Sequence, residues 1–125
     1  MGLLLGFNLE SRAGRDLQAY CGKHGHIYKN VPADQQWKKL SVLAGLEPET
    51  ERHGFTAAFS GPMLVICLFS EKQMDDLLKT MRQTGADIPL KAVLTPSNAR
   101  WTAAVLQKEL EKEREAFFTG KEKKR

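Results

Sequence analysis

Seven consecutive apolar residues, Met63–Phe69 (MLVICLF), place the strongest constraint on how this chain can fold. The run is far too short to cross a membrane as a helix, and its branched residues favour a strand. A strand that is apolar at every position is typical of one covered on both faces. We therefore predict a central buried strand here, and a second of the same kind at residues 2–7 (GLLLGF).

Helical and extended patterns alternate along the rest of the chain. More polar runs at residues 26–31 and 90–95 predict two edge strands. Apolar residues at helical spacing, together with caps and glycine stops, predict four helices. Their expected ranges are residues 11–24, 34–44, 71–84 (with Ser70 and Gln73 as a capping box) and 98–118.

This alternation predicts an α/β fold: a small single domain built from two β-α-β-α units around a four-stranded sheet. The two apolar strands should be central, which gives the strand order 2-1-3-4. We favour a parallel sheet with helices on both faces, because right-handed crossovers then cover it completely. The alternative is a ferredoxin-like α+β fold with extra helices. Its first and third strands are antiparallel, and the second and fourth helices cover the other face.

The two halves of the chain resemble each other. The segment PADQQW (residues 32–37) matches PSNARW (96–101) at an offset of 64, and Leu17 and Gly25 match Leu77 and Gly85 at an offset of 60. Because the same element order occurs in both halves, we expect an internal duplication. The predicted domain spans residues 1–118, with units 1–46 and 63–118.

The positive charge is concentrated at the end of the chain. The formal net charge is +4, and Lys121–Arg125 carry +3 of it. We expect residues 119–125 to form a disordered basic tail. Nucleic-acid binding through this tail is one functional alternative. The nearly neutral body argues against it, since no basic face would support the tail.

Sequence motifs for catalysis and cofactor binding are missing. The chain has no glycine-rich phosphate loop, so no nucleotide cofactor is predicted. His24 and His26 flank Gly25, but nothing at ligand spacing completes a metal site. Cys21 and Cys67 belong to no CxxC pair and are expected to be reduced core thiols. Without a leader or a membrane-spanning run, the expected location is the cytoplasm, away from membranes.

A cluster of polar residues follows the last predicted strand. Thr95, Ser97 and Asn98 lie where that strand gives way to a helix, and backbone amides at a helix N-terminus bind anions. Lys91 and Arg100 would add positive charge. These five residues form a candidate anion site. The simpler alternative is that Ser97 or Asn98 only caps the helix.

A second candidate site depends on the parallel sheet. Asn8 and Ser11 follow the first strand and Ser70 follows the third, so parallel strands would bring them to one crevice at the topological switch point. Each of these residues could equally be a helix cap and nothing more.

Further along, Phe117 and Phe118 lie near the end of the last helix. They predict a contact surface, with a homodimer as the expected partner state. Alternatively, the pair folds back on the core.

Two segments carry a resemblance to a known family. MLVICLFSEKQMDDLL and PLKAVLTPSNARWTAAVLQKELEKE, within residues 63–115, resemble an uncharacterised prokaryotic domain-of-unknown-function family. That family is marked by a PLKAVLTPxNxxW-like segment and a Glu/Lys-rich helix. The N-terminal half matches it more loosely. The resemblance implies a small prokaryotic cytosolic protein, and it implies no catalytic or binding residue.

The leading functional hypothesis is therefore a non-catalytic binding or regulatory module. It rests on the missing nucleophile–base pair, metal spacing and phosphate loop. The main alternative is a small enzyme or sensor that binds an anionic metabolite at helix N-termini near Ser70 and Ser97.

Overall fold

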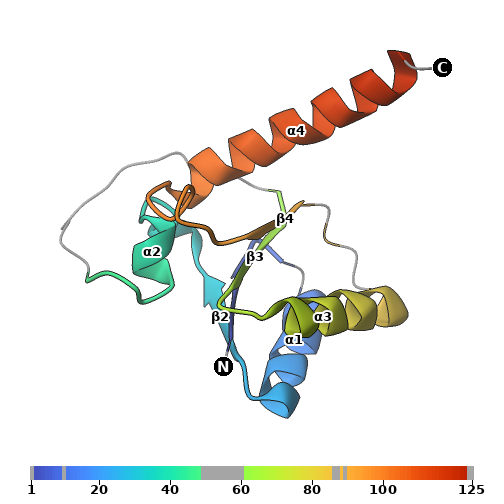
Figure 1. Ribbon diagram of the computed structural model, residues 1–125. Helices are drawn as coiled ribbons and strands as arrows, with labels where there is room; N and C mark the ends of the chain where they lie inside the picture. The colour runs from blue at the N-terminus through green and yellow to red at the C-terminus, as the bar shows by residue number, and fades with distance from the viewer. Residues whose placement is uncertain (1, 10, 49–60, 86–87, 89, 124–125) are drawn as a thin grey trace.

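The computed structural model describes the chain except for residues 1, 10, 49–60, 86–87, 89 and 124–125, and the side chains at residues 11 and 115–123 (Figure 1). Strands and helices alternate as the sequence predicts. In chain order they are β1 (Leu3–Phe7), α1 (Ser11–His24), β2 (Ile27–Val31), a 3₁₀ turn η1 (Ala33–Gln35), α2 (Leu40–Leu43), β3 (Met63–Cys67), α3 (Glu71–Thr84), β4 (Leu90–Val93) and α4 (Ala103–Lys123).

The four strands form one sheet in the order β2-β1-β3-β4, which confirms the predicted strand order and the α/β class. The sheet is mixed rather than parallel, so the favoured parallel arrangement is wrong. β1 pairs with β2 in parallel, and β3 pairs with β4 in parallel. The two central strands are antiparallel, with Leu5 opposite Val65.

The point where the chain enters β3 makes the sheet mixed. β2 ends at Val31, which pairs with Phe7, and β3 begins at Met63, opposite the same Phe7. β3 therefore starts at the end of the sheet where β1 and β2 finish, and it runs back antiparallel to them. An apolar strand reads alike in either direction, so the sequence pattern alone does not separate the two arrangements.

Helices cover both faces of the sheet, as predicted. α1 and α3 lie side by side on one face, and α2 and the start of α4 cover the other (Figure 1). Two right-handed β-α-β units joined through antiparallel first strands place both crossover helices on the same face. The core under α1 and α3 contains Leu4, Leu17, Cys21, Leu64, Ile66, Leu77, Met81 and Ile88. The core on the other face contains Leu5, Phe7, Val31, Leu40, Leu43, Met63, Val65, Leu90, Ala103 and Leu106.

Backbone geometry repeats between the two halves at a spacing of 60 residues. α1 and α3 have the same length and begin 60 residues apart. Gly25 and Gly85, one residue past these helices, both have φ 76°. Asn8 and Leu68, one residue past β1 and β3, are the non-glycine residues with positive φ, at 57° and 61°, in the described chain. The halves thus share one backbone design. A duplication as its origin stays a prediction.

The capping box of α3 is confirmed. Ser70 Oγ accepts from Gln73 N at 3.1 Å, and Ser70 N donates to Gln73 Oε1 at 2.9 Å. Gly85 then ends the helix in the left-handed conformation. The reciprocal bonds satisfy two backbone donors that the first turn would otherwise leave unpaired.

The second and fourth helices begin later in the chain than predicted. The expected helix at 34–44 is η1 followed by the single turn α2, and the expected helix start at Asn98 lies instead at Ala103. The second Pro-xxxx-Trp segment forms a turn that bonds to the start of α2. Leu40 N donates to Trp101 O and Ser41 N to Ala99 O, both at 2.9 Å. These bonds satisfy the first two backbone amides of α2, which have no acceptor within the helix.

α4 projects well beyond the sheet (Figure 1). Thr102 caps it, since Thr102 Oγ1 accepts from Val105 N at 3.3 Å. The helix continues to Lys123, and the predicted disorder of residues 119–125 stays a prediction. The predicted domain boundary at residue 118 is not tested by the fold.

Candidate functional site

The polar cluster after β4 closes on itself. Thr95 N donates to Asn98 Oδ1 at 2.9 Å, and Asn98 N donates to Thr95 Oγ1 at 3.3 Å. Asn98 Nδ2 also donates to Val93 O at 3.0 Å. These bonds use the polar groups that an anion would need. Ser97 and Arg100 remain exposed in the same turn, and an anion site there stays a prediction.

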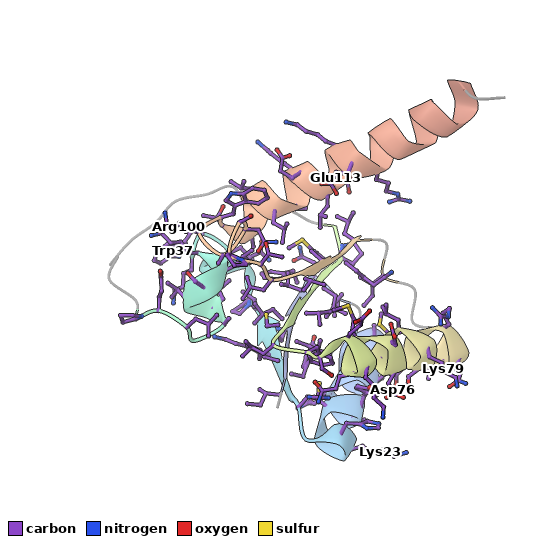
Figure 2. All side chains as sticks on the ribbon, in the orientation of Figure 1. Lys23, Trp37, Asp76, Lys79, Arg100 and Glu113 are labelled. Carbon is purple, nitrogen blue, oxygen red and sulfur yellow. The ribbon has the colours of Figure 1, made fainter. Side chains whose placement is uncertain are left out.

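The basic residues predicted beside this turn do not converge on it. Lys91 Nζ donates to Ile88 O at 2.8 Å, toward the start of β4. Arg100 lies with Trp37 in the layer formed by α2 and the base of α4, whereas Asp76 lies on α3 (Figure 2). The segment that most resembles a site in the sequence is therefore the junction that pairs the two halves of the chain.

The loops after β1 and β3 do not meet at one edge of the sheet, because these strands are antiparallel. Asn8 follows Phe7, which lies opposite Met63 at the start of β3, and Asn8 Nδ2 donates to Gly61 O at 3.1 Å. Ser70 follows the other end of β3. Asn8 and Ser70 thus lie at opposite ends of the sheet. Parallel strands would have brought them together.

Three predicted side chains lie outside the described residues: those of Ser11, Phe117 and Phe118. The backbone places Ser11 at the start of α1 and both phenylalanines on the projecting part of α4. The predicted homodimer contact through α4 is not tested by the structure.

The structure instead gathers polar and aromatic groups where α1 ends and α3 begins. Tyr20 on α1 donates its hydroxyl hydrogen to Asp76 Oδ2 on α3 at 2.6 Å. This is a short, charge-assisted hydrogen bond between two helices that run antiparallel. Tyr20 is only 8% exposed. Burial, followed by the hydrogen bond to Asp76, raises the pKa of Tyr20 well above its usual value, so the phenol keeps its proton.

His26, one residue before β2, is fixed beside this pair. Its Nδ1 accepts from Gly2 N at 2.9 Å, and its ring stacks on Phe69 with centroids 4.3 Å apart. The ring of Tyr20 lies 6.3 Å from that of His26, centroid to centroid, and 4.3 Å from that of His24, with those two rings tilted by 33°. Burial lowers the pKa of His26, which keeps the ring neutral near pH 7.

Two adjoining hollows open between α1 and α3. The first has a volume of about 290 Å³ and is here called the His26 site. The second has a volume of about 610 Å³, shares Tyr20 and His24 with the first, and is here called the Arg12 hollow. The His26 site is lined by Tyr20, His24, His26, Lys72, Gln73 and Asp76. The Arg12 hollow is lined by Arg12, Asp16, Ala19, Tyr20, Lys23, His24, Thr80, Gln83 and Thr84.

The two buried cysteine thiols are not activated as nucleophiles. Burial raises the pKa of Cys21 to about 11 and that of Cys67 to about 12, so both thiols stay protonated near neutral pH. Both are free, as predicted. Within the described part of the chain, no three His, Cys, Asp or Glu side chains are placed to hold a metal ion. The helices described here also include none with the length and apolar character to span a membrane.

None of the residues that line the His26 site belongs to the predicted candidate sites. The sequence HGH marks His24 and His26, but only as an incomplete metal motif. Tyr20 reads as part of the apolar stripe of α1, and Asp76 reads as an exposed carboxylate. They converge because the antiparallel central strands place the last turn of α1 beside the first turns of α3. Without the strand direction, the sequence offers no signal for this contact.

The buried His26 predicts a pH-dependent stability. Its pKa is lowered in the folded state, so the unfolded chain takes up a proton first as the pH falls. The stability that His26 contributes is therefore fully present above about pH 6.5. Below that it declines by at most about 1.4 kcal/mol per pH unit. Denaturant unfolding of the native chain and of His26→Asn between about pH 8 and 5 measures this. The stability difference between the two should shrink with falling pH, and a constant difference would contradict the assignment.

The fold defines the class of protein: a small α/β domain in which two β-α-β units meet through antiparallel strands. The two units share a polar groove between their helices. Residues 62–117 match the family described as a domain of unknown function, DUF3783. This match confirms the resemblance to an uncharacterised domain family. No curated protein and no solved structure matches the chain.

The matched range divides the His26 site between two parts of the chain. It includes Lys72, Gln73 and Asp76 on α3, whereas Tyr20 and His26 lie in the preceding half. The match begins one residue before β3 and runs through α3 and β4 into α4. It therefore covers one β-α-β unit and the first part of the helix after it.

Proposed function

We propose that this protein is a non-catalytic binding module whose ligand occupies the His26 site. The observation that supports it is the convergence of Tyr20, His26 and Asp76, from two helices and a strand start, around one hollow. Polar side chains held rigidly around a concave surface are the usual form of a small-molecule site. The volume of about 290 Å³ suits a small metabolite.

The chemistry of the same residues favours binding over catalysis. A general base near neutral pH needs a pKa close to the working pH. Tyr20 is held protonated, and its hydroxyl is engaged with Asp76. His26 is neutral, but its basic Nδ1 is occupied by Gly2 N. Both groups are thus suited to hold a ligand in place, and neither is free to remove a proton from it.

A fragment screen read by amide chemical shifts tests this proposal. The panel should contain anionic, neutral and cationic fragments in equal numbers, added to the full-length ¹⁵N-labelled chain. We expect saturable shifts at residues 20–26 and 69–76, whichever fragments bind. The comparison region is residues 97–102 near Arg100, on the other face of the sheet (Figure 2). Hits that cluster there, or a panel without any saturable shift at the His26 site, would contradict the proposed function.

A further inference from the structure

The hydrogen-bonding groups that line the His26 site are mainly donors. His26 accepts from Gly2 through Nδ1, so its neutral ring carries the proton on Nε2. The hydrogen bonds of His26 with other described residues run through Nδ1 and its backbone N–H. The Nε2 hydrogen is therefore a donor without a partner in the described structure, on the ring of a residue that is 9% exposed and lines the hollow.

α3 contributes two more donors. Gln73 Oε1 is used by the capping box, where it accepts from Ser70 N, and this leaves the Nε2 amide hydrogens of Gln73 for a ligand. Lys72 is exposed and forms no ion pair with another described residue. Both residues lie in the first turn of α3, where the helix dipole is positive and favours a negative charge. The dipole adds to a site that already has a hollow and a fixed histidine.

Asp76 is the acceptor of the site. Its Oδ2 receives the Tyr20 hydroxyl, which leaves Oδ1 without a donor among the described residues. A bound anion would be repelled by an isolated carboxylate, but the short bond from Tyr20 offsets part of that charge. Oδ1 would instead receive a hydroxyl or amino hydrogen of the ligand. The site thus offers three donor groups and one acceptor.

We propose that the His26 site binds a small metabolite that carries an oxyanion, either a carboxylate or a phosphate, next to a hydroxyl or amino group. The oxyanion contacts Lys72, Gln73 and His26 Nε2, and the neighbouring donor contacts Asp76. This inference rests on the proposed function and adds the chemical class of the ligand. We also expect a ligand with a neutral group in place of the oxyanion to bind poorly, because Lys72, Gln73 and His26 would then have no charged acceptor.

The Arg12 hollow provides a comparison inside the same molecule. Positions 60 residues apart give both hollows a basic and an acidic residue: Lys72 and Asp76 in one, Arg12 and Asp16 in the other. Both hollows also include Tyr20 and His24, but the equivalent positions on the two helices differ. Gln73 is replaced by Ala13, so the Arg12 hollow lacks the amide donor. Thr80 and Thr84 stand where the His26 site has Tyr20 and His24.

Matched pairs of probes test the ligand class. Lactate is compared with lactamide, and glycerol 3-phosphate with glycerol, by amide-shift titration of the full chain. We expect the anionic member of at least one pair to saturate shifts at residues 26 and 71–76, and to bind about 10-fold or more tightly than its neutral partner. The two pairs separate a carboxylate site from a phosphate site. Equal binding of charged and neutral partners, or no binding by either anion, overturns the inference.

Three variants locate the effect. Lys72→Gln removes an exposed charge and leaves the cap of α3 intact, and it should weaken anion binding by about 3- to 10-fold. Arg12→Gln in the other hollow and Lys79→Gln, further along α3 (Figure 2), lose the same charge and should leave binding unchanged. Anion binding that survives Lys72→Gln, or that falls equally in all three variants, overturns the inference. The proposed function fails separately, if no fragment of any charge binds at the His26 site.

Discussion

Replacing Leu4 with alanine is expected to lower the free energy of unfolding by about 2–5 kcal/mol. Leu4 is fully buried on the face of β1 that α1 and α3 cover, and it lies opposite Ile66 on the neighbouring central strand. Truncation removes its transfer free energy and leaves a cavity that the rigid sheet cannot close. Denaturant unfolding followed by circular dichroism measures the change.

Leu68 provides the matched control for this substitution. Its side chain is 60% exposed, one residue after β3. Leu68→Ala removes the same atoms without opening a cavity, so the free energy of unfolding should change by less than about 0.5 kcal/mol. Similar losses for both variants would mean that Leu4 is not in a packed core, which would contradict the arrangement of α1 and α3 over the sheet.

Replacing Gly2 with alanine is expected to destabilise the fold and to disrupt the His26 site together. A Cβ at this position would clash with the ring of Phe69 and come within 3.1 Å of His26 Nδ1. The ring of Phe69 must then move out of its stack on His26. Overpacking of this kind costs about 1–3 kcal/mol. Thermal unfolding and the chemical shifts of the His26 ring report the two effects separately.

Gly22 is the control for the glycine substitution. It lies within α1 and is exposed, and a Cβ there would meet nothing within 4 Å. Because alanine favours a helix over glycine by about 0.5–1 kcal/mol, Gly22→Ala should stabilise the protein by a similar amount. The same chemical change is thus expected to have opposite signs at the two positions. A stabilising Gly2→Ala would show that Phe69 does not pack where the structure places it.

The sequence predicts local structure well where a signal is carried by neighbouring residues. The bounds of α1 agree with its predicted range, and the capping box of Ser70 and Gln73 forms as expected. The order of the strands also follows, because an apolar strand must be central and a polar one can stay at the edge. These features depend on spacing and polarity within a few residues, which the sequence displays directly.

Strand direction and the site depend on contacts that the sequence does not display. The apolar run at Met63–Cys67 is equally compatible with both directions, because a strand buried at every position has the same pattern whichever way it runs. The Pro-xxxx-Trp segments read as helix starts, but the second forms a turn that accepts from the start of α2, as Trp101 O does from Leu40 N. The His26 site follows from the strand direction, so it could not be predicted before the direction was known.

The contact between Tyr20 and Asp76 is the most direct test of this account, because it requires antiparallel central strands and also forms the His26 site. A nuclear Overhauser spectrum of the ¹³C- and ¹⁵N-labelled chain measures it. Cross-peaks between the ring protons of Tyr20 and the β-protons of Asp76 are expected. A parallel sheet with right-handed crossovers would separate α1 and α3 onto opposite faces. If these cross-peaks are absent from a fully assigned spectrum, both the fold and the proposed site are wrong.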